Sequence, residues 1–154
     1  MGKEKKKRLL EGHDSQCNEH AKEIVCEENN SCYTARNKHK SLVRKYKIDG
    51  DVFQKNAGEL RCDYMILNDD MKNAYLIELK ASKVKHGLEQ LDNTEKLFRN
   101  ELKVYTFYKR LVFSGKSATH GVMSSELRRW QERGGKVASV WCNIFKRSPM
   151  KEDI

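Results

Sequence analysis

The sequence predicts an α/β fold in which a mixed sheet is flanked by helices. Three strand-like segments separated by short polar turns occupy residues 46–80, and short turns join antiparallel neighbours. Beyond them, segments with helical periodicity alternate with apolar strand-like segments, an order typical of parallel strands joined by crossovers. Because 154 residues suit a single core, we expect one domain over residues 13–148, with a basic, disordered tail at 1–12 and a short tail at 149–154.

The N-terminal part of this domain is interpreted as helical. Residues 15–29 are predicted as a helix, with a thin apolar face made by Ala21, Ile24 and Val25. The basic segment 33–45 could be a solvated helix face or a surface that follows a nucleic-acid backbone. Three strands come next, at residues 46–53, 60–67 and 74–80, with turn residues around 56–58 and 68–70.

The second half of the domain alternates helices with strands. Residues 82–100 form the first predicted helix, whose apolar side chains recur at helical spacing, at Val84, Leu88, Leu91 and Phe98. The other predicted elements are a strand at 109–114, a helix from 124 or 125 to 133, and a strand at 137–145. Trp130 and Trp141 lie in amphipathic and apolar segments, so we expect both to pack in the core rather than against bases.

The bulk composition favours a polyanionic partner. The formal net charge is +9, which points first to nucleic acid and second to a membrane surface. No stretch approaches the roughly 18 consecutive apolar residues of a membrane span, and there is no apolar leader near the N-terminus. We therefore expect a cytoplasmic protein without a membrane partner.

The five cysteines include no CxxC pair, so we expect reduced thiols rather than disulfides. Cys17, His20, Cys26 and Cys32 could be imagined as a zinc site, but their spacing matches no standard zinc motif. Buried or half-buried thiols are the preferred interpretation.

Polar residues interrupt two of the predicted strands at neighbouring positions. In the second strand Asp63 shares a face with Arg61, Met65 and Leu67, and Cys62 shares the other face with Tyr64 and Ile66. In the third strand Glu78 and Lys80 are two residues apart and share a face. A hairpin around residue 69 would therefore place Asp63 beside Glu78.

Two adjacent carboxylates repel each other unless a cation lies between them. Mg²⁺ prefers oxygen ligands and typically takes one or two protein carboxylates, several waters and a substrate phosphate. Lys80 would then stabilise negative charge on the reacting phosphate. The plainer alternative is that Glu78 and Lys80 form an exposed ion pair, but both acids lie in apolar strands, where an unpaired carboxylate is costly.

Asp63 together with Glu78-Leu79-Lys80 resembles the motif of the PD-(D/E)XK nuclease superfamily, which includes restriction endonucleases and archaeal-type Holliday junction resolvases. The resemblance covers residues 20–145 in predicted topology but only these four residues in motif, and Cys62 replaces the proline. It implies a restriction endonuclease-like αβββαβ core. It also implies metal ligation by Asp63, Glu78 and the Leu79 carbonyl, a catalytic Lys80, and Mg²⁺ with Mn²⁺ as a substitute.

Further site residues are expected on two helices. Many members of the superfamily carry a glutamate on the first helix, and Glu27 or Glu28 could serve. The start of the helix at 82–100 would point near the acids, and a helix N-terminus favours phosphate. The residues expected to contact nucleic acid there are Lys83, Lys85, His86 and Gln90. An exposed polar face is the alternative interpretation for them.

The sequence therefore predicts a metal-dependent nuclease that acts on nucleic acid, with DNA preferred over RNA and structured or branched DNA among the candidate substrates. An endonuclease is expected more than an exonuclease. One alternative is a non-catalytic nucleic-acid-binding module on the same fold, and another is a protein-interaction subunit whose acids form buried ion pairs. Because no separate specificity domain is evident, we expect either a homodimer or recognition of nucleic-acid shape.

Overall fold

A computed structural model of the protein describes residues 7–28, 31–55, 58–80, 84–114, 124–140 and 150–154. Its strands are β1 (Glu23–Glu28), β2 (Ser31–Arg36), β3 (Val43–Lys47), β4 (Tyr64–Asn68), β5 (Asn73–Lys80), β6 (Thr106–Ser114), β7 (Lys136–Val140) and β8 (Met150–Asp153). The two helices of this part of the chain are α1 (Val84–Phe98) and α2 (Ser124–Glu132). None of the helices described is long and apolar enough to cross a membrane.

The central layer is a five-stranded mixed sheet in the order β3-β4-β5-β6-β7. The first three strands form an antiparallel meander. A tight turn joins β4 to β5, as is typical of antiparallel neighbours, whereas residues 48–63 separate β3 from β4. The last three are parallel, and α1 and α2 lie in the connections between them. The predicted antiparallel and parallel pairings are confirmed. The strand predicted at 46–53 is wrong beyond Lys47, because residues 48–53 fold into a hydrogen-bonded turn.

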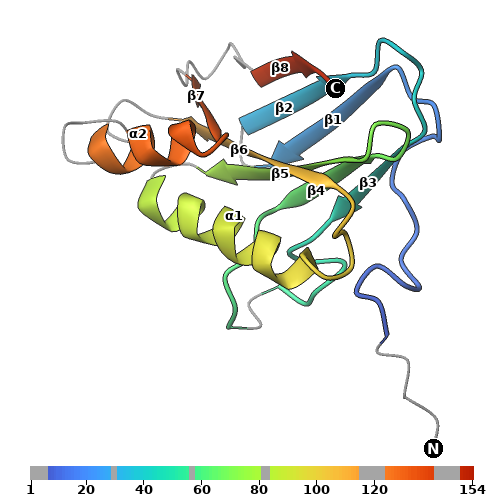
Figure 1. The fold of residues 1–154 in the computed structure, drawn as a ribbon, viewed down its shortest axis with the longest axis horizontal. Helices are drawn as coiled ribbons and strands as arrows, with labels where there is room; N and C mark the ends of the chain where they lie inside the picture. The colour runs from blue at the N-terminus through green and yellow to red at the C-terminus, as the bar shows by residue number, and fades with distance from the viewer. Residues whose placement is uncertain (1–6, 29–30, 56–57, 81–83, 115–123, 141–149) are drawn as a thin grey trace, which may run out of the picture.

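The two faces of this sheet are covered differently. Figure 1 shows α1 and α2 on one face and a second sheet, in the order β1-β2-β8, on the other. In the part of the chain that the structure describes, the expectation of a sheet flanked by helices therefore holds for one face only. The fold is α/β with a mixed sheet, but strands stand where the predicted core has its first helix.

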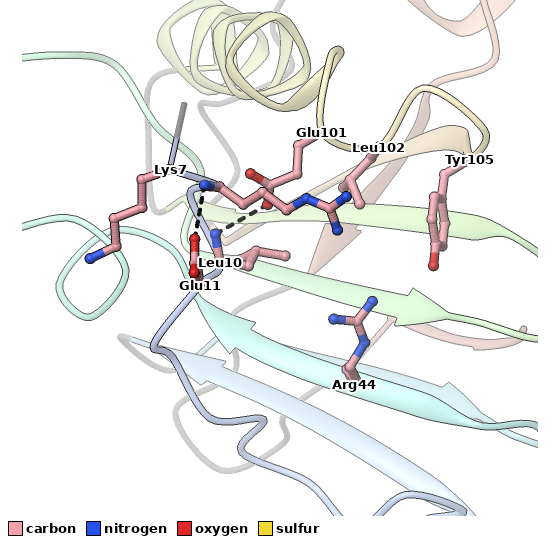
Figure 2. A pocket seen from close by; sticks show the side chains of 8 residues that line it. Lys7, Leu10, Glu11, Arg44, Glu101, Leu102 and Tyr105 are labelled. Atoms are coloured by element: carbon pink, nitrogen blue, oxygen red, sulfur yellow. Dashed lines mark hydrogen bonds between the residues drawn. The ribbon is translucent and has the colours of Figure 1, made fainter. Parts of the chain in front are cut away.

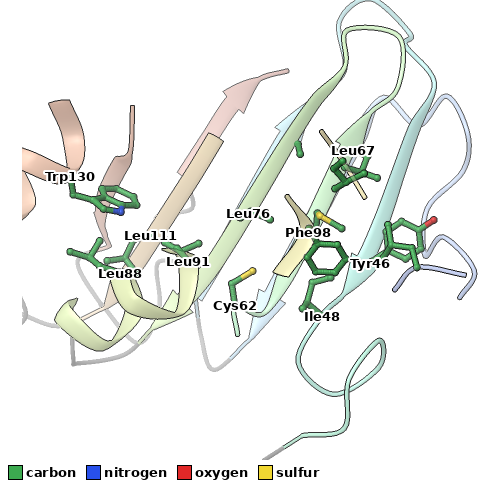
Figure 3. Packing of buried hydrophobic residues seen from close by; sticks show 14 residues of the cluster. Tyr46, Ile48, Cys62, Leu67, Leu76, Leu88, Leu91, Phe98, Leu111 and Trp130 are labelled. Atoms are coloured by element: carbon green, nitrogen blue, oxygen red, sulfur yellow. The ribbon is translucent and has the colours of Figure 1, made fainter. Parts of the chain in front are cut away.

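One hydrophobic cluster lies between the central sheet and the helices (Figure 3). Leu88, Leu91 and Phe98 from α1 belong to it, as their helical spacing predicted. Trp130 from α2 is also buried in this cluster, which confirms its expected place in the core. Trp141 lies outside the described residues.

A second cluster lies between the two sheets, and it explains why residues 23–36 are strands. Ile24 and Cys26 are buried while Val25 is 38% exposed, a two-residue period that fits a strand and not the predicted helix. In β2, Tyr33 and Ala35 are fully buried. The helix prediction at 15–29 is therefore wrong, and the segment at 33–45 is not helical but supplies β2, a turn held by Asn37, and the start of β3.

Residues 150–154, expected to be a tail, include β8, which pairs in parallel with β2. Glu152 anchors this strand, since its Oε1 accepts hydrogen bonds from the Tyr33 hydroxyl at 2.5 Å and from Arg110 Nε at 2.6 Å. Burial and the nearby Glu152 carboxylate raise the pKa of Tyr33 well above its ordinary value. A buried, charged network therefore joins the second sheet to β6.

Replacing Glu152 by Ala should destabilise the fold by about 3 kcal/mol, because it leaves the Arg110 guanidinium buried without its carboxylate. The Arg110 side chain is only 4% exposed. Urea unfolding of both proteins measures the difference. Lys151→Ala is the control on the same strand, since Lys151 pairs with Glu23 at the surface and should change the midpoint little. Equal effects of the two substitutions would contradict a buried anchor.

The described part of the N-terminal segment is held against the domain. Leu10 is buried in the cluster beneath α1, and the backbone N–H groups of Leu9 and Leu10 donate to the Glu101 carboxylate. A cavity of about 820 Å³ lies beside this segment. Figure 2 shows its lining, with Arg44 of β3 and Tyr105 on the side away from Lys7. Leu9 and Leu10 thus pack against the domain instead of extending into solvent, although the residues on either side of them are exposed. Residues 1–6 lie outside the described part.

Candidate functional site

Asp63 lies immediately before β4, opposite Glu78 of β5. The pairing of Tyr64 with Ile77 sets this alignment, and the backbone N–H of Leu79 donates to Asp63 Oδ2 at 2.8 Å. On its other side, the Asp63 carbonyl accepts from the Ile48 N–H at 2.8 Å. The structure therefore brings the two acids together, as the register of the hairpin predicted.

Glu78 is buried between the central sheet and α1, with 1% of the residue exposed. Gly87 of α1 lies directly over it, because a Cβ atom at Gly87 would be 3.6 Å from Glu78 Cγ. The Cys62 thiol is close as well: burial raises its pKa, and the charge of Glu78 adds to that effect. Cys62 packs with Met65 and Leu67, so its predicted place on the other face is wrong, since the strand alternation starts only at Tyr64.

A third carboxyl group comes from the end of β1. Glu28 interacts with Asp63, and among the described residues its buried Oε2 atom has no hydrogen-bond partner. The resemblance suggested Glu27 or Glu28 on a first helix. The structure instead places Glu28 near Asp63 from a strand. The sequence carries no clear signal for this placement, because the apolar Val25 stands between Ile24 and Cys26, where a half-exposed strand would carry a polar residue.

The electrostatics of this acid cluster, Glu28, Asp63 and Glu78, are unfavourable to negative charge. Burial raises the pKa of Asp63 to about 7, the Leu79 N–H opposes that shift, and the charge of Glu28 reinforces it. The fold therefore favours the protonated form of Asp63 more than water does. A bound divalent cation would favour the ionised carboxylates and so offset this cost.

The other predicted site residues fall into three groups. Lys80 ends β5, with a side chain outside the described part of the structure, and Lys83 lies wholly outside it. Lys85 is exposed and His86 half-buried in the first turns of α1. Gln90 is buried, and its Nε2 donates to the Arg61 carbonyl at 2.9 Å. Its interpretation as part of an exposed polar face is therefore wrong.

Two further residues of α1 contact the segment before Asp63 and were not singled out from the sequence. Asn93 Nδ2 donates to the Leu60 carbonyl, and the Thr94 hydroxyl accepts from the Cys62 N–H at 2.8 Å. With Gln90 they occupy positions i, i+3 and i+4, which share one helix face. That spacing of polar side chains beside the apolar positions Leu91 and Phe98 is the signal that could have found them.

The donor chemistry of the acid pair fits a hard divalent cation, because carboxylate oxygens are the ligands that such ions prefer. In the described part of the chain, no group of three or more His, Cys, Asp or Glu side chains is arranged to hold a metal ion. Any ion would thus depend chiefly on two carboxylates. The same finding does not support a zinc site in the described residues made by Cys17, His20, Cys26 and Cys32.

Cys17, Cys26, Cys32 and Cys62 form no disulfide and are buried or half-buried, as the preferred interpretation expected, while Cys142 lies outside the described residues. Comparisons with models of protein families, with curated proteins and with solved structures found no match to this chain.

Proposed function

We propose that the protein is a metal-dependent nuclease that hydrolyses phosphodiester bonds in nucleic acid, with DNA preferred over RNA. The observation that carries the proposal is the meeting of Asp63 and Glu78 across the β4–β5 pair, with the Leu79 N–H held by Asp63. Two carboxylates buried together are costly, and the raised pKa of Asp63 reflects that cost. A site built to hold a divalent cation explains why the fold tolerates it.

Asp63 and Glu78 would hold Mg²⁺, or Mn²⁺ in its place, and the resemblance adds the Leu79 carbonyl. When bound, such an ion supplies Lewis-acid polarisation of a phosphoryl oxygen and lowers the pKa of a bound water. Lys80 follows Glu78 by two residues in β5, which puts both on the same face of that strand. Its ammonium would stabilise negative charge on the phosphate during attack.

Two further lines support nucleic acid as the substrate. The net charge of +9 favours a polyanion, and the exposed Lys85 lies on the same helix that packs against Glu78. Endonucleolytic cleavage, structured or branched DNA as substrate, and a homodimer are proposed from the resemblance, since two sites related by symmetry suit a two-stranded substrate.

One observation favours a second candidate, a nucleic-acid-binding module on the same fold that does not cut. Glu78 is almost completely buried, so a substrate phosphate would reach a cation there only from the side of Asp63. A module of this kind would bind DNA through its basic surface and would need no ion.

The test is cleavage by the full chain of linear, circular, four-way-branched and single-stranded DNA and of RNA, with Mg²⁺ or Mn²⁺. We expect cleavage of at least one DNA substrate and none when EDTA removes the ion. Fluorescence anisotropy with Ca²⁺ measures binding separately. Binding without cleavage of any substrate would replace the nuclease by the binding module, and the absence of both would overturn both.

A further inference from the structure

We propose that α1 is a positioning element for the acid pair. Gln90, Asn93 and Thr94 hold the segment that ends in Asp63, and Gly87 allows the same helix to lie against Glu78. The role of this arrangement in catalysis rests on the proposed nuclease function. Whether α1 holds Asp63 in place can be tested separately.

The residues that lead into Asp63 lie outside the sheet. Residues 60–62 precede β4, which begins at Tyr64, while Asp63 itself accepts from the Ile48 N–H through its carbonyl. The backbone carbonyls of Leu60 and Arg61 are bound by the side-chain amides of Asn93 and Gln90. The Cys62 N–H donates to Thr94 Oγ1. Three consecutive residues are thus fixed by side chains of one helix.

Thr94 is the key residue of these three because its hydroxyl both accepts and donates a hydrogen bond. It accepts from the Cys62 N–H at 2.8 Å and donates to the Gln90 carbonyl at 2.7 Å, and the residue is completely buried. A hydroxyl is the small side-chain group that can donate and accept at once. Because Cys62 is buried as well, losing this acceptor leaves a buried N–H without a partner.

The same face of α1 also sets the position of Glu78. Positions 87, 90, 91 and 94 follow helical spacing, and at Gly87 the helix lies so near the sheet that a Cβ atom would be 2.7 Å from Leu111 Cδ1. The positions of both acids are therefore set by contacts with the same helix. Metal-binding carboxylates must be held within about 0.5 Å of their productive positions, so the clamp formed by Gln90, Asn93 and Thr94 would act on affinity through Asp63.

The experiment compares Thr94→Val with Thr94→Ser and with Tyr105→Phe. Valine keeps the shape but removes the acceptor, and serine restores it. Tyr105→Phe is the matched control, because it removes a hydroxyl that donates to Asp69 at 2.6 Å, at the opposite end of β4 from Asp63. The three readouts are Mn²⁺ affinity by calorimetry, the NMR resonance and exchange rate of the Leu79 amide, and the urea midpoint.

We expect Thr94→Val to weaken Mn²⁺ binding about tenfold, as loss of an outer-shell partner commonly does. The Leu79 amide, which donates to Asp63, should shift and exchange faster. Thr94→Ser should restore both. Tyr105→Phe should lower the urea midpoint while leaving Mn²⁺ affinity and the Leu79 resonance unchanged.

The inference is overturned if Thr94→Val and Tyr105→Phe both lower stability and neither changes the Leu79 amide. If the wild type binds no Mn²⁺ and cuts nothing, the proposed function fails, but the Leu79 amide still decides whether the clamp positions Asp63. Should Thr94→Val not fold, Asn93→Ala replaces it with the same readouts, since Asn93 is only partly buried and holds the Leu60 carbonyl.

Discussion

Replacing Glu78 by Gln should lower the rate of Mg²⁺-dependent DNA cleavage by about a hundredfold or more. The substitution keeps the shape of the side chain but removes one of two carboxylates proposed to hold the ion, a larger loss than the 10- to 100-fold effects of outer-shell changes. Cleavage rates at saturating DNA and Mg²⁺ measure it. DNA binding should stay equal or become tighter, because a negative charge is lost.

Glu89→Gln is the matched control for this prediction. Glu89 is exposed on α1, so its substitution removes the same charge from the same neighbourhood without touching the acid pair. We expect Glu89→Gln to cut DNA at the wild-type rate. If Glu78→Gln cuts DNA as fast as Glu89→Gln, the acid pair is not the catalytic site, even though the protein is a nuclease.

Asp63→Asn should make the protein more stable at alkaline pH and should flatten its pH dependence. The pKa of Asp63 is raised from 3.8 to about 7 in the folded protein. Between these two values the folded state holds a proton that the unfolded state has released, so stability falls as pH rises through this window. Because the Asp63 side chain is partly open to solvent, which screens its interactions, we expect the loss to be about 2 kcal/mol. Asparagine cannot ionise, and its carbonyl can still accept from the Leu79 N–H.

Urea unfolding of both proteins at a series of pH values between 4 and 8 measures this difference. Adding Mg²⁺ provides the second arm, because an ion that binds the folded state stabilises it in proportion to its occupancy. Mg²⁺ should restore stability to the wild type at alkaline pH and should do little for Asp63→Asn. Parallel pH profiles for the two proteins would contradict a raised pKa at this position.

The elements predicted from the sequence were those whose signals are local. The β4–β5 hairpin follows from two apolar runs joined by a polar turn, and α1 follows from the spacing of Leu88, Leu91 and Phe98. The side-by-side placement of Asp63 and Glu78 needed only that hairpin and its register. Each of these steps uses interactions between residues close in the chain, which periodicity records directly.

The missed elements depend on partners far away in the chain. β1 and β2 bury Ile24 and Tyr33 against the central sheet, and local propensity does not reveal a surface assembled from later segments. The approach of Glu28 to Asp63 follows from the same long-range packing. Gln90 was expected to contact nucleic acid or to lie on an exposed face, and Asn93 and Thr94 were not singled out. Nothing local indicates that residues 60–62 lack a strand partner and need hydrogen bonds from a helix.

The pairing of β2 with β8 has a consequence for biosynthesis. Tyr33 and Glu152, which join the two strands, are 119 residues apart, so the ribosome delivers the partner strand long after β2. Until then, one edge of β2 presents unpaired N–H and C=O groups to other nascent chains, a setting that favours intermolecular association. Closing so large a loop is also slow. We therefore expect the pairing of β8 with β2 to form late in the folding of the new chain.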